Sequence, residues 1–170
     1  MVSLREAIGS SWIFMIVISF TLIFSGFLVM ALSYSRVYKV KNELTSIIEK
    51  YEGLTTTDTS TKTIKGSVSV MNLYLQNNSY NAKGYCYDGT TSMYGFNLDS
   101  DTVEVARENE RYAYCVKVTT NTKTCGTIFR VTLFYEFNLP ILGDLAKFKV
   151  SGQTNELTKS FVNDAQIKCK

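Results

Sequence analysis

Residues 12–34 read WIFMIVISFTLIFSGFLVMALSY, and this stretch determines the fold expected for the rest of the chain. From Ala7 to Ser35 the sequence contains no charged residue. As a helix with a rise of 1.5 Å per residue, the stretch is about 35 Å long, enough to cross a hydrocarbon core of about 30 Å. Trp12 and Tyr34 stand at its two ends, where aromatic residues gather at membrane interfaces. The sequence therefore predicts a membrane span from Trp12 to Tyr34.

A cleaved signal peptide is the alternative interpretation of an apolar segment near the amino terminus. The apolar region of a signal peptide is usually about 7–15 residues long and ends in a cleavage site of small residues. Neither property fits this stretch, so we expect the span to be retained.

The helical pattern continues beyond the span as one apolar stripe. Its members recur at helical spacing: Val37, Val40, Leu44, Ile47, Ile48 and Tyr51. No proline interrupts the pattern, and Gly53 after Glu52 is the first expected C-cap, which predicts one helix from about Ile8 to Glu52. We expect the stripe to pack on the globular part of the same chain, and a coiled-coil seam is the alternative.

The charges that flank the span give a weak signal about its orientation. Arg5 and Glu6 precede the span, whereas Arg36, Lys39 and Lys41 follow it, and a simple positive-inside count would place the carboxyl-terminal part in the cytosol. Charges on a packed helix need not act as topology signals, and an even number of cysteines suits an oxidising compartment. We therefore expect the amino terminus inside the cell and the head outside.

The residues after Gly53 predict a small head that is rich in β-structure. Residues 55–63 are mostly Thr and predict an exposed loop, and 67–76 favour a short helix. Residues 111–119 and 127–137 alternate as two strands of a hairpin, and 148–157 predict a further strand around Gly152. The expected inward faces are Tyr112, Tyr114, Val116 and Val118 on the first strand and Phe129, Val131, Leu133, Tyr135 and Phe137 on the second. The expected outward or edge positions are Arg111, Ala113, Cys115, Lys117 and Thr119, then Thr127, Arg130, Thr132 and Glu136.

The expected fold class is α+β, with a long membrane-spanning helix packed on a small antiparallel β-sheet head. The helix occupies residues 1–53 and the extracytoplasmic head occupies residues 54–170. The apolar face of the antiparallel sheet needs a cover, and the stripe that begins at Val37 supplies one.

Four cysteines, Cys86, Cys115, Cys125 and Cys169, predict two disulfides, because the sequence has no CxxC pair and no histidine to complete a zinc site. Three pairings are open, and four reduced thiols are the alternative. We favour Cys86 with Cys115 and Cys125 with Cys169, since the second bond would tie down the carboxyl terminus.

The composition excludes several classes of function. The 170 residues include no histidine, so Ser-His-Asp and Cys-His catalysis and every His-ligated metal site are excluded. The 18 Lys and Arg against 15 Asp and Glu leave a net charge of +3, too small for the basic face of a nucleic-acid-binding protein. We expect no catalytic residue, no cofactor and no nucleic-acid partner.

The acidic residues near position 100 form an incomplete calcium-loop pattern. Asn97, Asp99, Asp101 and Glu108 match positions 1, 3, 5 and 12 of such a loop, but Thr102 occupies the position that needs glycine for a sharp turn. We therefore expect an ordinary acidic turn and no metal site.

The order of these features resembles a type IV pilin-like protein, and in particular a TadE-like pseudopilin of the tight-adherence (Tad) pilus systems in their Gram-positive form. The stretches that carry the resemblance are RVYKVKN (36–42), IIEKYEG (47–53), GYC (84–86), YCV (114–116), FYEFNLPILG (134–143) and VSGQT (150–154). The resemblance covers nearly the whole chain. It implies a structural subunit of a pilus or secretion assembly, with other pilin-like subunits or the secretion platform as partners.

Glu6 is the residue to which the resemblance gives a specific role. Pilins of this architecture are cut after a glycine, which leaves a glutamate at the fifth mature position, where it neutralises the amino terminus of a neighbouring subunit. No glycine precedes Glu6 here, and cutting after Gly9 would place Phe14 at that position. The simpler role for Glu6 is an acid in the first turn of a helix, where the helix dipole favours it.

Two functions are therefore expected from the sequence. The first is a single-pass, membrane-anchored pilin-like subunit with an extracellular head, able to join a surface pilus. The second is a membrane anchor that carries a stand-alone extracellular binding or adhesion module outside any filament.

Overall fold

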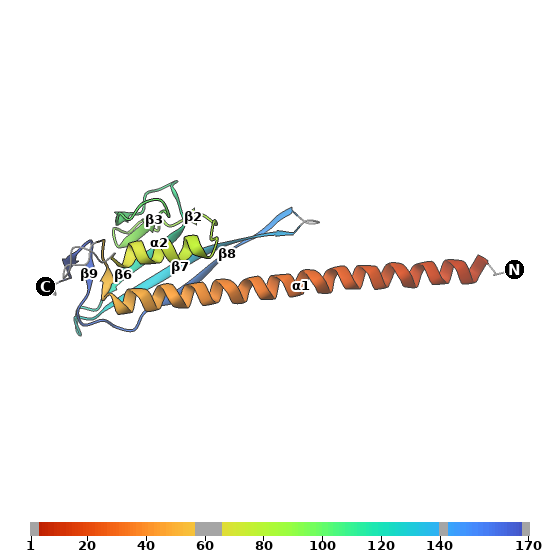
Figure 1. Cartoon of the computed structure of the whole chain (residues 1–170), viewed down its shortest axis with the longest axis horizontal. Coiled ribbons are helices and arrows are strands. Elements are labelled where there is room, and N and C mark those ends of the chain that lie inside the picture. Colours follow the sequence, from red (N-terminus) through yellow and green to blue (C-terminus); the bar gives the residue numbers. More distant parts are fainter. Residues whose placement is uncertain (1–3, 57–65, 140–142, 168–170) are drawn as a thin grey trace.

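The computed structural model of the chain describes residues 4–56, 66–139 and 143–167, and the side chains of all of these except 4–10, 137–139 and 143–147. A single helix, α1 (Leu4–Lys50), runs for 47 residues and projects far beyond the rest of the molecule (Figure 1). The long helix and the antiparallel sheet beside its carboxyl-terminal end make the fold α+β.

The two halves of α1 have different environments. Toward its carboxyl-terminal end, Val37, Val40, Leu44, Ile47 and Ile48 are buried in the main hydrophobic core, with Leu44 and Ile48 fully inaccessible. Tyr51, just beyond the helix, is partly buried against the same core. The amino-terminal half of α1 carries large apolar side chains that remain exposed. The packing of the head therefore begins near Val37, well before the boundary expected at residue 53.

The helix ends earlier than the sequence predicted. It stops at Lys50, and the residue with a left-handed backbone is Glu52, with φ of 55°. Gly53, which was expected to cap the helix, instead belongs to β1 (Gly53–Leu54), which pairs in parallel with β9 (Phe161–Val162). Gly53 has a φ of 136°, and a Cβ at this position would lie 2.2 Å from the Phe161 carbonyl oxygen. Both features require glycine. The glycine thus serves a close approach between strands.

The head is built on a five-stranded antiparallel sheet with the order β4-β3-β6-β7-β8. The strands are β3 (Met93–Phe96), β4 (Glu104–Val105), β6 (Tyr114–Thr120), β7 (Thr127–Leu139) and β8 (Gly143–Gln153). The expected hairpin is present as β6 and β7, in register from Tyr114–Leu133 to Thr120–Thr127. Two small sheets complete the head: β2 (Gly84–Tyr85) with β5 (Arg111–Tyr112), and β1 with β9 and β10 (Ala165–Gln166).

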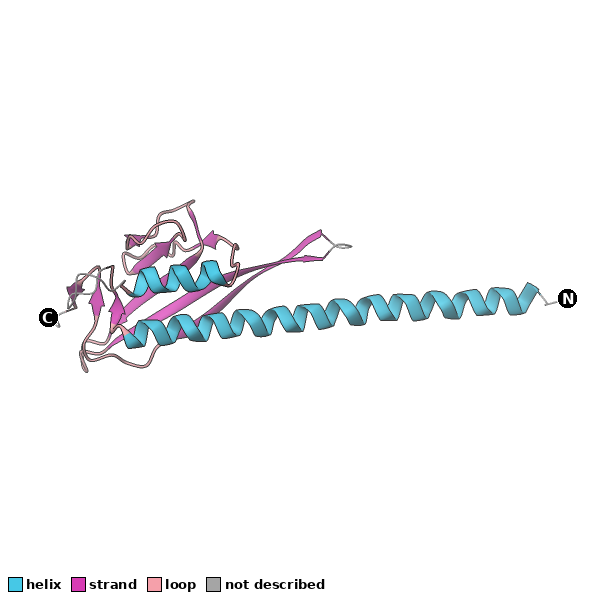
Figure 2. Cartoon of the chain, in the orientation of Figure 1, coloured by secondary structure: helices cyan, strands magenta, loops and turns pink. Residues whose placement is uncertain are grey.

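One face of the main sheet is covered by two helices. The expected short helix is present as α2 (Ser67–Asn77), which lies beside α1 over the sheet (Figure 2). Val68, Met71 and Leu75 from α2 join the α1 stripe and the inward residues Phe129, Val131 and Leu133 of β7 in one core. Tyr114 is also in this core; its hydroxyl donates to the Asn72 side chain at 3.0 Å. Burial raises the pKa of Tyr114 well above its ordinary value, so that it remains neutral.

The opposite face of the sheet carries a second, smaller core that the sequence did not predict. Its buried members are Ala82, Cys86, Ala106, Tyr112, Cys115 and Phe134. Cys115 was expected to point outward, and it is buried here because the segments around Cys86 and Ala106 cover this face. The predicted single strand is broken at Ala113, and the break reverses the faces. Ala113 joins the helix-side core, and Tyr112 lies in the second core instead of beside Tyr114.

The start of β7 also differs from the prediction. Thr127 was expected at the outside or edge, but it is fully buried, and its Oγ1 accepts a hydrogen bond from the Ser160 hydroxyl at 2.8 Å. Its backbone exchanges two hydrogen bonds with Leu157, both 2.9 Å long. The strand expected at 148–157 is longer at its start, since β8 begins at Gly143, and it ends at Gln153 with Leu157 forming an isolated bridge.

The long connection between α1 and α2 lies mostly outside the described residues. Its predicted exposed loop, 55–63, is described at Thr55 and Thr56, and both are half-buried. The Thr55 amide donates to the Ser67 hydroxyl at 2.9 Å, and the Thr56 amide donates to the Asp164 carboxylate at 3.0 Å. These bonds attach the start of the loop to α2 and to the carboxyl-terminal segment.

A disulfide joins Cys86 to Cys115, the first pairing that the sequence favoured, and it lies in the second core. Cys125 is disulfide-bonded as well, and Cys169, its expected partner, lies outside the described residues. The Cys86–Cys115 bond attaches the covering segment of the second core to the central strand β6.

Replacing Leu44 or Ile48 by Ala is expected to lower the free energy of unfolding by about 2–5 kcal/mol, because each side chain is fully buried between α1 and the sheet. Urea unfolding of the detergent-solubilised chain, followed by circular dichroism, measures the change. Leu73→Ala on α2, where Leu73 is 44% exposed, is the matched control and should cost less than about 1 kcal/mol. Equal losses at buried and exposed positions would contradict this core.

The double substitution Cys86→Ala with Cys115→Ala is expected to lower stability by about 3.5 kcal/mol, the chain-entropy value for a sequence separation of 29 residues. The shift in the urea midpoint under non-reducing conditions measures it. Full reduction of the unsubstituted chain should lower the midpoint further, because it also breaks the bond at Cys125. An unchanged midpoint in the double variant would refute a stabilising role.

Candidate functional site

The exposed half of α1 is the first candidate site. Among the described residues, α1 is the one helix that is long and apolar enough to cross a membrane. Trp12 is 72% exposed and Tyr34 is 57% exposed, and the large apolar residues between them are exposed as well. A continuous apolar surface of this length is far larger than the patches that water-soluble monomers leave uncovered. This half of the helix therefore needs another apolar environment, either lipid or other helices.

Two polar side chains within this segment, Thr21 and Ser25, hydrogen-bond to the helix backbone. The Thr21 hydroxyl donates to the Val17 carbonyl oxygen at 2.8 Å, and the Ser25 hydroxyl donates to the Leu22 carbonyl oxygen at 3.0 Å. Unsatisfied polar groups are costly in hydrocarbon, where water is absent. These two hydroxyls present no unpaired donor to a lipid environment.

A groove lies where the exposed half of α1 meets the head. It has a volume of about 200 Å³ and is lined by Ser33, Arg36, Val37, Val40, the segment 78–82, Tyr135 and Glu136. Arg36 is the first charged residue after the apolar segment, and its guanidinium donates to the Asn78 carbonyl oxygen at 2.7 Å. This volume is below the range of about 300–1,000 Å³ typical of small-molecule sites. The groove thus marks the boundary between helix and head.

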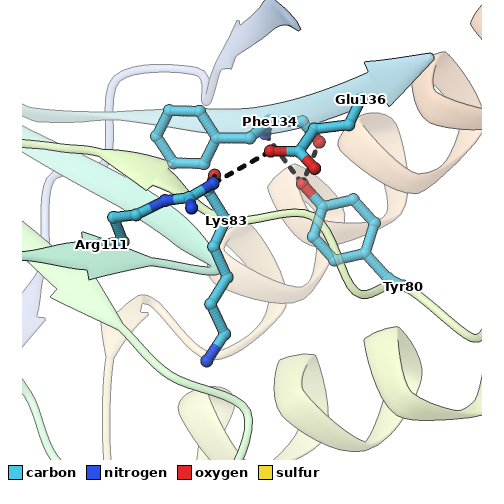
Figure 3. Close-up of polar contacts among 5 residues, drawn as sticks. All are labelled: Tyr80, Lys83, Arg111, Phe134 and Glu136. Carbon is cyan, nitrogen blue, oxygen red and sulfur yellow. Dashed lines mark hydrogen bonds and ion pairs between the residues drawn. The ribbon is translucent and has the colours of Figure 1, made fainter. Parts of the chain in front are cut away.

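Tyr80 lines this groove and hydrogen-bonds to the backbone of Phe134. Its hydroxyl donates to the Phe134 carbonyl oxygen and accepts a hydrogen bond from the Phe134 amide at 2.8 Å (Figure 3). Burial, reinforced by the nearby Glu136 carboxylate, raises the pKa of Tyr80 well above its ordinary value, although the bond to Phe134 opposes the shift. The neutral phenol thereby joins the segment after α2 to the middle of β7.

An ion pair on the surface links the same elements. The Arg111 guanidinium contacts the Glu136 carboxylate at 2.9 Å and donates to the Lys83 carbonyl oxygen at 2.7 Å (Figure 3). Both side chains are well exposed, at 45% and 35%, so the pair itself contributes at most about 1 kcal/mol. Its role is to position β5, β7 and the segment after α2 relative to one another.

The acidic residues of the incomplete calcium pattern are not gathered into a cluster. Among the described residues, no group of three or more His, Cys, Asp or Glu side chains lies close enough to hold a metal ion. Asp101 instead accepts a hydrogen bond from the Asn72 amide at 3.0 Å, which attaches this turn to α2.

The other residues singled out by the sequence are distributed as follows. The stripe from Val37 to Ile48 lies in the core and so is not free to form an external coiled-coil seam. Glu6 lies within α1, and its side chain is outside the described part of the chain. Trp12 and Tyr34 lie along the exposed segment, 22 positions apart in one helix of 47 residues.

Comparison with known proteins gives no match to a protein-family model, to a curated protein or to a solved structure. The functional argument therefore depends on the geometry of this chain.

Sequence reasoning did not identify Tyr80, Arg111 or Glu136 as residues of this boundary. Tyr80 directly follows the Asn-Asn-Ser stretch that ends α2, which is a local signal for a turn but gives no hint of its contact 54 positions away. Glu136 was assigned to an outward position on its strand, and its partner Arg111 lies 25 positions away.

Tyr80→Phe is expected to lower the free energy of unfolding by about 1–3 kcal/mol, because the buried backbone groups of Phe134 lose their partner. The variant should also change the pH dependence. The folded-state pKa is raised above the unfolded value of about 10, so the contribution of Tyr80 is complete below pH 10 and is lost as the pH rises beyond it. The melting temperature should therefore fall less steeply above pH 10 in the variant.

Thermal unfolding between neutral pH and about pH 11 measures both effects. Tyr85→Phe is the matched control, because Tyr85 is 56% exposed, and it should leave stability nearly unchanged. If Tyr80→Phe and Tyr85→Phe give the same stability and the same alkaline slope, the proposed role of the Tyr80 hydroxyl is wrong.

Proposed function

We propose that the protein is a single-pass, membrane-anchored pilin-like subunit, a TadE-like pseudopilin of a Tad or type IV pilus or secretion assembly, and that it acts structurally through helix packing. The observation that carries this proposal is that one helix is exposed and apolar over Trp12–Tyr34, then becomes part of the core of the head without a break. A flexible tether would let the head move independently of the span. A continuous helix instead makes the span and the head one rigid subunit, as packing into an ordered array requires.

The environment of the exposed helix supports storage in a membrane and packing against other helices. Its side chains are large and apolar, and its hydroxyls at Thr21 and Ser25 are satisfied internally. Lipid and neighbouring helices can therefore replace one another around this surface without leaving these two hydroxyls unpaired. Glu6, near the start of α1, is the residue that would meet the amino terminus of a neighbouring subunit in such an assembly.

The contacts of two of the three flanking basic residues, Arg36 and Lys41, weaken the argument for a cytosolic head, whereas Lys39 is exposed. Lys41 is buried, with its ammonium 3.8 Å from the centre of the Tyr38 ring, and Arg36 is bound to the Asn78 carbonyl. Both charges are engaged by their own chain, which weakens their value as cytosolic retention signals. The Cys86–Cys115 disulfide favours an oxidising compartment for the head.

The second candidate function is a membrane-anchored extracellular binding module that joins no filament. Under this function, a head released from the helix by cleavage at about Gly53 should fold alone. Such a cut would remove Leu44 and Ile48, which are fully buried in the head's core. The geometry therefore favours a head that needs its helix over an independent module with a tether.

Placing a photo-crosslinking amino acid at Ile23, which is 74% exposed in the apolar segment, is expected to give covalent adducts with a second copy or with another pilin-like subunit in native membranes. The reason is that the exposed surface has no partner within its own described chain. Immunoblotting and mass spectrometry of the adducts identify the partner. The same amino acid at Tyr87, which is 48% exposed in the head, is the matched control.

Adducts at Ile23 but not at Tyr87 would support assembly through the helix. Adducts with lipid alone at Ile23, in membranes that contain the rest of the secretion machinery, would overturn the structural-subunit proposal and favour the anchored binding module.

A further inference from the structure

The groove between α1 and the head crosses the end of the apolar segment. On the α1 side, its lining residues are Ser33, Arg36, Val37 and Val40, which extend over about 10 Å of the helix axis. Ser33 belongs to the uncharged stretch, and Arg36 is the first charged residue after it. The groove therefore begins beside the apolar surface of the helix and ends beside its polar surface.

The position of the groove along α1 gives its depth in a membrane. A bilayer is about 30 Å thick in its hydrocarbon core and about 40–45 Å thick with its headgroups, so each headgroup layer is about 5–8 Å thick. If the stretch from Trp12 to Tyr34 crosses the core, the groove lies across the headgroup layer on the side of the head. A lipid beside α1 at this level would place its acyl chains on the apolar helix and its phosphate at the groove.

Arg36 supplies the positive charge that a lipid phosphate needs. Its guanidinium has five N–H donors, and its Nη2 donates to the Asn78 carbonyl oxygen at 2.7 Å. That bond holds the guanidinium against the segment after α2 and leaves donors for a second acceptor. Because a guanidinium can bind two phosphate oxygens at once, Arg is well suited to recognise such a group.

The other polar groups at the groove fit the rest of a headgroup. Ser79 and Asn81, which are both exposed, add a hydroxyl and a carboxamide to its lining. Glu136 also lines the groove, but its carboxylate is 2.9 Å from the Arg111 guanidinium, which compensates its charge (Figure 3). Arg36 and Arg111 against Glu136 leave one positive charge at the groove, which favours an anionic headgroup over a zwitterionic one.

We propose that this groove binds the headgroup of an anionic phospholipid, with the Arg36 guanidinium bound to its phosphate. This inference rests on the proposed membrane anchor. The volume of about 200 Å³ is below what a typical small-molecule ligand needs. A phospholipid needs a protein site for its headgroup alone, because the membrane already surrounds its acyl chains. The size, depth and charge of the groove therefore agree with the same ligand.

A lipid bound here contacts three parts of the chain at once. Arg36 belongs to α1, Ser79 and Asn81 follow α2, and Tyr135 belongs to β7. The bound headgroup would therefore hold the head at one height above the lipid surface. It would also concentrate anionic lipid around the point where α1 leaves the membrane.

Native mass spectrometry of the full chain in detergent can test this site, because it separates the chain with bound lipid from the chain without it. The probes are phosphatidylglycerol, which is anionic, and phosphatidylcholine, which is zwitterionic, with the same acyl chains. We expect one phosphatidylglycerol to bind per chain with an apparent affinity about fivefold or more above that of phosphatidylcholine. This ratio corresponds to the attraction of one basic side chain to an anionic lipid surface.

Two pairs of variants locate the site. Arg36→Gln is expected to abolish the preference for phosphatidylglycerol. Lys39→Gln removes one charge from an exposed position of α1 outside the lining of the groove, and it should retain the preference. Ser33→Phe fills the groove without a change in charge and should weaken binding, with Ser35→Phe at an exposed position outside the lining as its control. Retention of the disulfide in the second core and of the helical circular dichroism signal shows that each variant is folded.

Three binding results would overturn the proposal. Equal effects of Arg36→Gln and Lys39→Gln would show general attraction of lipid to the basic flank of the helix and no site in the groove. Complete competition by glycerol phosphate at the concentration of the lipid would show a site for a soluble phosphate. Dimers of the chain that carry no phosphatidylglycerol, beside monomers that do, would show that a second copy covers the groove.

Flotation of the chain with phosphatidylcholine vesicles tests the membrane anchor separately. Flotation without a preference for phosphatidylglycerol in the binding experiment would leave the anchor intact and refute the lipid site alone. A chain that does not float with vesicles of either lipid would refute the anchor, and the lipid site with it.

Discussion

One helix in this chain must satisfy two environments, and the packing of its second half determines how the head is built. Leu44 and Ile48 are fully buried, so the sheet cannot complete its core without α1. The first half of the same helix exposes large apolar side chains from Trp12 to Tyr34. Because no break separates the halves, the position of the head relative to the exposed segment is fixed by covalent and helical geometry.

The remaining contacts of the head reinforce this arrangement at the level where the two halves meet. Arg36 binds the carbonyl that follows α2, and Tyr80 joins the next residues of that segment to the backbone of Phe134. Arg111 and Glu136 connect the same region from the outer face. Long-range contacts thus converge at one level of α1, where the apolar segment ends and β7 passes beside the helix.

Much of the fold could be predicted from local patterns in the sequence. The long apolar helix follows from the length of uncharged sequence, the stripe from its 3.6-residue period, and the β6–β7 hairpin from alternation around a polar turn. The face reversal at Ala113 could not be predicted. Alternation in 111–119 gives no sign that β5 pairs with β2 while β6 pairs with β3 and β7. Thr127 was placed outside for a similar reason: its burial depends on Ser160 and Leu157, which approach from a distant part of the chain. The boundary residues Tyr80, Arg111 and Glu136 are likewise defined by partners 25 or more positions away.

If α1 crosses a bilayer, its unbroken apolar surface sets an energetic condition on any movement of the chain out of it. Leu, Ile, Phe and Val residues each favour the centre of a membrane by about 0.3–0.6 kcal/mol, so extraction of the whole segment into water would cost on the order of 5 kcal/mol or more. The rigid junction with the head offers no way to leave part of the segment behind. Release from lipid would therefore have to be coupled, residue by residue, to burial of the same side chains against another protein surface.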